Sequence, residues 1–203
     1  MQGAVNKIIN RIYGNGRGWC FTPGNFSDLG TSEVVRKALS RLEKQGLIRR
    51  LAHGIYDYPQ RHIKLGVLPP DIQKVAKAIS DKYKIQIQVS GAYAANLIGI
   101  SKHVPGKIVY LTDGRSMKYK IGNLELIFKR TTPKNMKKAG SISGIVIAAL
   151  RFIGKDNVNE RIINILKNNL SDEDKKRLKL DASLAPVWIS KIINDKIYGG
   201  LHE

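Results

Sequence analysis

The feature that most constrains the fold of this chain is one amphipathic helical pattern that ends at a glycine. Residues 31–46 read TSEVVRKALSRLEKQG. At about 100° per residue the apolar side chains fall on one arc, and they are Val34, Val35, Ala38, Leu39 and Leu42. Thr31 or Ser32 is expected to cap the start, and Gly46 suits the left-handed position after the end. The pattern predicts a helix with one face in a core and a cationic face outside.

Two short apolar segments follow that helix and predict a hairpin. Residues 47–58 read LIRRLAHGIYDY. We expect two strands joined by a three-residue turn, with Gly54 at a positive φ. Neighbouring strand residues point to opposite faces, and Arg49 shares its face with the flanking leucines. We therefore expect Arg50 rather than Arg49 to face a ligand.

The segments before the helix complete a recognisable order of elements. Residues 4–12 space their isoleucines as an amphipathic helix, and three alternating glycines after them predict a flexible connector. Residues 25–29 can hold a short helix. The order of helix, short helix, basic helix and hairpin is that of a winged helix-turn-helix, whose last helix lies in the DNA major groove and whose wing reaches the flanking backbone or minor groove. We assign this domain to residues 1–66.

The remaining residues, 67–203, predict a mixed α/β domain with a helical C-terminal portion. Residues 62–70 (HIKLGVLPP) predict a linker, because two adjacent prolines bar regular hydrogen bonding. Strand patterns predict a small mixed sheet, at residues 85–89, 107–112, 117–121 and 124–131. The expected fold class of the whole chain is α+β.

The charge of the chain is unevenly distributed. The sequence has 35 Lys and Arg against 16 Asp and Glu, a net charge of +19. The basic excess is +7 in residues 1–66, +11 in residues 67–153 and only +1 in residues 154–203. Such a distribution favours a surface that binds a polyanion, because each cation placed at a phosphate releases condensed counterions. A generic basic surface is the alternative explanation.

No pattern predicts catalysis, and we expect neither a metal nor a cofactor. The four histidines are scattered, and the single Cys20 cannot form an internal disulfide or a zinc site. We expect Cys20 to be a small buried apolar residue. The longest apolar run, GIVIAAL, is too short to span a membrane. The expectation is a non-enzymatic cytoplasmic protein with no membrane partner.

Three stretches together resemble a known family. They are VVRKALSRLEKQGLIRRLAHGIYDYP (34–59), SGAYAANLIGISKHVPGKIVYLTDGRS (90–116) and IGNLELIFKR (121–130). They are similar to a short branch of the AbiEi-type antitoxin family of transcriptional regulators, over roughly residues 21–192. The resemblance implies an N-terminal winged helix, a C-terminal antitoxin domain and repression of a toxin-antitoxin operon. It also implies a functional partner, a nucleotidyltransferase-like toxin that is counteracted without a stable complex.

The candidate contacts to double-stranded operator DNA are polar residues of the connector, the recognition helix and the wing. They are Arg17, Ser32, Arg36, Lys37, Ser40, Arg41, Lys44, Arg49, Arg50 and His53. In the second domain the resemblance points to a basic or polar surface that would contact nucleic acid or a partner. Its residues are Lys102, Arg115, Lys118, Lys120, Lys129 and Arg130.

Two other functions remain open at this point. The first is an RNA-binding or ribonucleoprotein module that uses the basic surface of residues 67–153. Its aromatic side chains would stack on bases, and they are Tyr93, Tyr110, Tyr119 and Phe128, although aromatic residues at strand spacing are more often core. The second is a protein-interaction adaptor whose winged helix no longer binds DNA.

Overall fold

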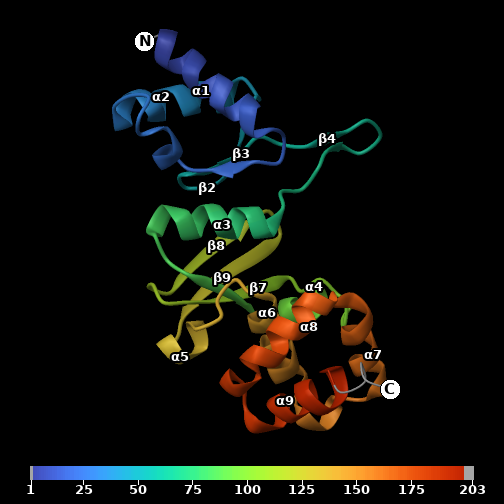
Figure 1. Ribbon diagram of the computed structural model, residues 1–203. Helices are drawn as coiled ribbons and strands as arrows, with labels where there is room; N and C mark the ends of the chain where they lie inside the picture. Colours follow the sequence, from blue (N-terminus) through green and yellow to red (C-terminus); the bar gives the residue numbers. More distant parts are fainter. Residues whose placement is uncertain (1, 199–203) are drawn as a thin grey trace. The chain divides into compact units, whose positions relative to one another are not determined.

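The computed structural model describes residues 2–198 and has the expected α+β composition (Figure 1). It divides into two compact units. Unit 1 contains the residues up to 85 together with 120–122, and unit 2 contains 86–119 and the residues from 123 onward. The units therefore do not divide at residue 66, because helix α3 (Ile72–Tyr83) packs against strands β1 and β3 of unit 1.

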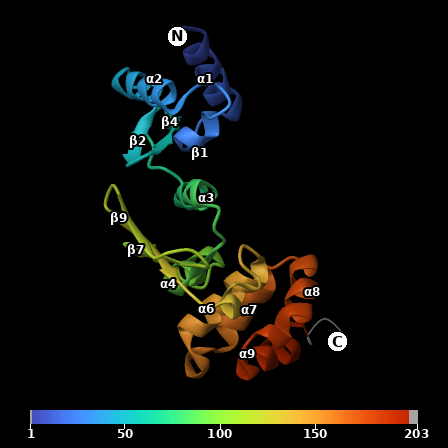
Figure 2. The same ribbon diagram turned by 90° about the vertical axis from the view of Figure 1, so that its left-hand side faces the viewer.

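Unit 1 combines three longer helices with a small antiparallel sheet in the order β1-β3-β2. Besides α3, its elements are α1 (Gln2–Asn15), β1 (Cys20–Phe21), the 3-10 helix η1 (Pro23–Phe26), α2 (Ser32–Lys44), β2 (Arg49–Ala52), β3 (Ile55–Asp57), β4 (Arg61–His62) and β5 (Gly66–Val67). Figure 2 shows α1 and α2 beside each other in this unit.

The predicted helix and hairpin form where the sequence placed them. The Thr31 hydroxyl caps α2 by accepting a hydrogen bond from the Val34 amide at 3.4 Å, and Gly46 follows the helix at φ +69°. The β2–β3 turn contains only His53 and Gly54, with Gly54 at φ +67°. One residue more than predicted therefore joins the first strand, and the pairing register shifts between Arg50 and Ala52.

The core of unit 1 is built from the apolar faces of α1 and α2 and from aromatic residues of the sheet. Phe21 and Phe26 meet edge to face, with ring centroids 5.4 Å apart. Cys20 is buried, as predicted, and burial raises the pKa of its thiol to about 12. At the surface, Arg11 donates to both carboxylate oxygens of Asp28, at 2.6 and 2.7 Å, and these hydrogen bonds lower the Asp28 pKa to about 2. This pair fastens α1 to the segment after η1.

The predicted linker is instead a β-ribbon. Arg61 pairs with Val67 and His62 with Gly66, so β4 and β5 form a two-stranded antiparallel sheet of their own. The prolines that suggested a linker come after this ribbon, and Asp71 then caps α3. The prediction of a linker was wrong because strands of two residues are too short to show the alternation of a β-strand.

Unit 2 contains most of the mixed sheet predicted from the sequence, in the order β6-β7-β9-β8, and only the last two residues of β8 fall in unit 1. Strands β6 and β7 are antiparallel, whereas β7 and β9 are parallel. The elements are β6 (Ile87–Ser90), α4 (Gly91–Leu97), β7 (Lys107–Thr112), β8 (Met117–Ile121), β9 (Leu124–Arg130), α5 (Pro133–Met136), α6 (Ile142–Ile153), η2 (Lys155–Asn157), α7 (Glu160–Asn169), α8 (Asp172–Asp181), η3 (Ala182–Leu184), α9 (Val187–Lys191) and the π-helical segment η4 (Ile192–Tyr198). The larger helices lie on one side of the sheet (Figure 2).

The aromatic residues considered as a base-stacking platform belong mainly to the core of unit 2. Tyr93, Tyr110 and Phe128 are buried, and Tyr110 and Phe128 stack with centroids 5.8 Å apart. The half-buried Tyr119 contacts the edge of the same cluster. These rings hold strands and α4 together and do not form an open platform. Over residues 2–198, no helix has the length and apolar character needed to cross a membrane.

Candidate nucleic-acid interface

The polar face of α2 is exposed and cationic. Arg36 and Arg41 are five positions apart, so they project about 140° apart around the helix axis and mark the two edges of this face. Between them lie the exposed side chains of Lys37, Ser40 and Lys44. Ser32 begins the helix, and Lys37 pairs with Glu33 at 2.7 Å.

The two adjacent arginines of β2 have different environments. The Arg49 guanidinium binds both carboxylate oxygens of Asp57, at 3.1 and 2.6 Å, and Asp57 is only 1% exposed. Arg49 therefore fastens β2 to β3, and its guanidinium is engaged by Asp57. Arg50 is exposed, and its NH2 group lies 3.1 Å from Nδ1 of His53 in the turn.

Arg50 opens onto a groove that we call the basic groove. It has a volume of ≈ 590 Å³ and is lined by cationic side chains from α2, the hairpin and the end of α3. These cations are Arg36, Arg50, Lys82 and Lys84, and the His53 side chain also lines the groove. The lining also includes the start of η1 and one acid, Asp81, which pairs with Lys77 at 2.7 Å. Within residues 2–198 no carboxylate pairs with the groove's arginines or lysines.

Two lysines at the end of α3, Lys82 and Lys84, line this groove and were not predicted from the sequence. The Lys82 ammonium lies beside the hairpin turn, since a Cβ on Gly54 would come within 3.2 Å of it. Lys84 ends α3 in the left-handed conformation at φ +53°, where glycine is usual. A lysine there accepts some backbone strain and places a charge in the groove. The sequence showed Lys-Tyr-Lys at a helix end but gave no sign that it meets the hairpin.

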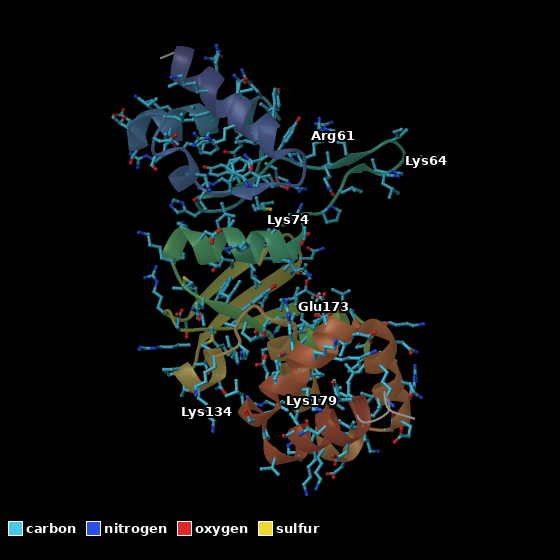
Figure 3. The ribbon with its side chains drawn as sticks, viewed as in Figure 1. Arg61, Lys64, Lys74, Lys134, Glu173 and Lys179 are labelled. Carbon is cyan, nitrogen blue, oxygen red and sulfur yellow. The ribbon has the colours of Figure 1, made fainter. Side chains whose placement is uncertain are left out.

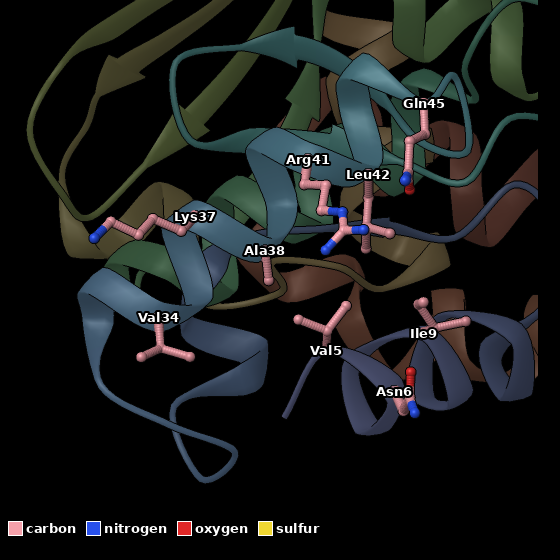
Figure 4. A pocket seen from close by; sticks show the side chains of 9 residues that line it. All are labelled: Val5, Asn6, Ile9, Val34, Lys37, Ala38, Arg41, Leu42 and Gln45. Carbon is pink, nitrogen blue, oxygen red and sulfur yellow. The ribbon is translucent and has the colours of Figure 1, made fainter. Parts of the chain in front are cut away.

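Arg41 faces a second groove, between α1 and α2. This groove has a volume of ≈ 420 Å³ and an apolar floor that includes Val5, Ile9 and Val34. Figure 4 shows the Arg41 side chain extending from α2 toward α1, whereas Lys37 points away from it. Arg41 and Arg36 therefore lie at opposite edges of the exposed face of α2, each beside a different groove.

Arg17 is not placed near α2. Its guanidinium lies 4.6 Å from the Tyr58 ring centroid, and its NH1 group donates to the Pro59 carbonyl oxygen at 2.9 Å. It thereby supports the base of the β4–β5 ribbon.

The residues predicted in the second domain do not gather in one place. Lys118 pairs with Glu125 at 2.7 Å near the start of β9. Lys129 and Arg130 lie at the other end of that strand, near Arg115, because the Arg130 amide donates to Ser116. Lys102 lies in the loop after α4, and Lys120 belongs to unit 1.

Unit 2 contains a different set of neighbouring cations. We call this set the α5–α6 cluster. Its members are Lys134, Lys137, Lys138 and Arg151, and the cavity among them is only ≈ 50 Å³. Lys138 pairs with Asp181 at 2.8 Å, and Arg151 donates to the Asn135 side chain at 3.2 Å. In the described part of the chain, no three His, Cys, Asp or Glu side chains are arranged to hold a metal ion.

Comparison with known proteins gives a family but no activity. No curated protein matches the chain. The model of a family of unknown function (DUF6088) matches residues 7–178, which include all of the basic groove and most of unit 2. With most of its length matched, the chain belongs to the DUF6088 family.

Proposed function

We propose that this chain is a sequence-specific DNA-binding transcriptional repressor. Unit 1 would carry a winged helix-turn-helix with α2 as the recognition helix and the β2–β3 hairpin as the wing. The observation that carries the proposal is the basic groove, in which cations from α2, the hairpin and α3 meet without paired carboxylates. A duplex with α2 in its major groove would run its phosphate backbone along these cations.

The arrangement of α2 suggests a division of roles. Arg36 and Arg41, at the two edges of the exposed face, would meet phosphates on opposite walls of the major groove. Ser40 and Lys44, nearer the centre of that face, would approach base edges. Arg50, Lys82 and Lys84 would hold the flanking backbone.

The antitoxin role is a separate part of the proposal. It rests on the resemblance of residues 34–59, 90–116 and 121–130 to AbiEi-type regulators. In this role the chain would act in the cytoplasm, without catalysis or a cofactor, to repress its own operon and counteract a nucleotidyltransferase-like toxin. Expression of a neighbouring nucleotidyltransferase-like gene, with and without this chain, tests it. Rescue of growth would support the role, and persistent arrest would contradict it.

DNA binding is tested with fluorescent duplexes of about three helical turns, roughly 30 base pairs, tiled across the region upstream of the gene. We expect one duplex to bind more tightly than a scrambled sequence. Arg50→Ala should weaken binding to every duplex and reduce the slope of log affinity against log salt by about 0.9. Lys74→Ala, on α3 but outside the basic groove, is the matched control.

Three outcomes would contradict the proposal. If no duplex binds at moderate salt, the adaptor function is favoured. If single-stranded RNA competes as well as duplex DNA does, the RNA-binding function is favoured. If Arg50→Ala behaves like Lys74→Ala, the basic groove is not the DNA site.

A further inference from the structure

The β4–β5 ribbon, residues 60–68, has no place in the core of unit 1. The Leu68 amide donates to the Gln60 carbonyl oxygen at 2.9 Å and closes its base. Both strands are exposed, and the ribbon extends outward beyond the end of β3 (Figure 1). His62 orders the tip, because its Nδ1 accepts hydrogen bonds from the amides of Lys64 and Leu65 at 3.2 and 3.3 Å. The tip is therefore ordered by its own hydrogen bonds, although its side chains are exposed in the described part of the chain.

Apolar side chains are concentrated on this ribbon. Ile63 is fully exposed, Leu65 is 72% exposed and Val67 is 45% exposed. Water contact at three large apolar side chains within five residues is unfavourable. Such a patch, on an element that adds nothing to the core, is typical of a contact surface.

The charge of the ribbon indicates the chemistry of its partner. Arg61 stands on β4 and Lys64 at the tip, and Figure 3 shows both side chains on the projecting ribbon. Residues 58–70 contain no Asp or Glu. Arg17 adds a third cation at the base. Exposed apolar groups flanked by cations alone are complementary to a groove walled by phosphates.

The position of the ribbon fits a duplex already bound by unit 1. The ribbon leaves β3 at the end opposite to the His53–Gly54 turn. Lys64 lies ten positions after Gly54. An extended chain of that length spans at most about 33 Å, which is the upper limit of the distance from the turn to the ribbon tip. The turn and the ribbon therefore extend from opposite ends of β3, so that a duplex lying along the hairpin would meet both.

We propose that the β4–β5 ribbon is a second DNA-contacting arm that enters a minor groove, an inference that rests on the proposed DNA-binding function. Ile63 and Leu65 press against base edges and open a base step, and Arg61 and Lys64 contact the phosphates on either side. Insertion of apolar side chains at a base step kinks the duplex. The ribbon therefore bends its DNA.

The test uses the tightest upstream duplex, labelled with a dye at each end, so that energy transfer reports bending and anisotropy reports affinity. Two variants remove the ribbon's contacts: Ile63→Ser with Leu65→Ser, and Arg61→Ala with Lys64→Ala. The matched control is Leu180→Ser, which changes a leucine of α8 in unit 2 that is 80% exposed. All three variants should unfold at the wild-type temperature, because the changed side chains are exposed.

We expect the serine variant to lose the bend and bind roughly ten-fold more weakly, since the burial of two apolar side chains is lost. The alanine variant should bind more weakly. Because two phosphate contacts are lost, the slope of log affinity against log salt should fall by about 1.8. Netropsin, which occupies the minor groove, should lower the DNA affinity of the wild-type chain and leave the DNA affinity of the serine variant unchanged.

The two failures are distinguishable. If the wild-type chain binds no duplex, the proposed function and the ribbon inference both fall. If it binds and both ribbon variants behave like Leu180→Ser, only the ribbon inference is overturned. It is also overturned if the serine variant keeps its DNA affinity but no longer binds vesicles of phosphatidylglycerol and phosphatidylcholine, because the ribbon would then contact lipid.

Discussion

The basic groove of unit 1 and the α5–α6 cluster of unit 2 are both rich in cations, but they hold them differently. In unit 1 the cations come from three elements and line an open groove of ≈ 590 Å³. In unit 2 two of the four cations are engaged with Asp181 or Asn135, and the cavity among them is ≈ 50 Å³. Residues 67–153 carry the larger charge excess in the sequence, but that segment crosses the boundary of the units, and two of its cations, Lys82 and Lys84, line the basic groove of unit 1. Charge per segment is therefore a poorer guide to an anion site than the convergence of unpaired cations.

The largest difference between the two regions should appear when cations are removed from each of them in turn. Arg36→Ala with Arg50→Ala should weaken DNA binding by about 100-fold, because two charge-assisted contacts are lost. Lys134→Ala with Lys137→Ala should change it by less than about two-fold, as expected for charges away from the duplex. Anisotropy titrations at one salt concentration measure both. Equal losses from the two double variants would show that unit 2 shares the interface.

The next largest effect is a difference in stability between variants of the two adjacent arginines of β2. Arg49→Ala would leave Asp57 buried and unpaired, and we expect the free energy of unfolding to fall by about 2 kcal/mol, less than for a fully buried pair because Arg49 is partly exposed. Arg50→Ala should change it by less than about 0.5 kcal/mol. Urea unfolding of the two variants measures the difference. If Arg50→Ala is the more destabilising change, the roles assigned to the two arginines are reversed.

A smaller effect is expected at the end of α3. Lys84→Gly should relieve the left-handed conformation and raise the free energy of unfolding by about 0.5–1 kcal/mol. The same change should weaken DNA binding by about five-fold, because a phosphate contact is lost. Thermal unfolding and anisotropy on one preparation measure the two effects. A tighter complex, or a less stable protein, would show that Lys84 is not held in this conformation to supply charge.

The smallest effect lies in unit 2. Ser143 is buried in α6, and its hydroxyl has no hydrogen-bond partner among residues 2–198. Ser143→Ala should raise the free energy of unfolding by about 0.5 kcal/mol, since an unpaired buried hydroxyl is lost and alanine favours a helix. DNA affinity should not change. Chemical denaturation checks the first expectation, and a destabilised variant would imply a contact of the hydroxyl that this structure lacks.

Much of the fold could be predicted from local patterns. Three features of α2 were predicted correctly, because each depends on residues within a few positions. They are its apolar face, its cap at Thr31 and the glycine after its end, Gly46. The mixed sheet of unit 2 was also predicted, because β7 and β9 have clear strand patterns. The β4–β5 ribbon was missed because its strands are two residues long and its prolines suggested a linker.

The candidate site was only partly predictable, because it depends on contacts between distant segments. Alternation along β2 correctly set Arg50 apart from Arg49, but the partner of Arg49 lies on the next strand. Lys82 and Lys84 belong to a helix whose pattern gave no sign that it packs beside the hairpin. The cations predicted in the second domain were chosen from a family resemblance. Their positions in the sequence could not show that they lie apart in the fold.

Hydrogen–deuterium exchange of the full chain, with and without the tightest upstream duplex, tests the central claim most directly. We expect the duplex to slow exchange in α2, at the β2–β3 turn, in the ribbon and at the end of α3. We expect no change in α5 and α6. Protection confined to α5 and α6, with α2 and the hairpin unchanged, would contradict the claim that the basic groove of unit 1 is where the chain holds DNA.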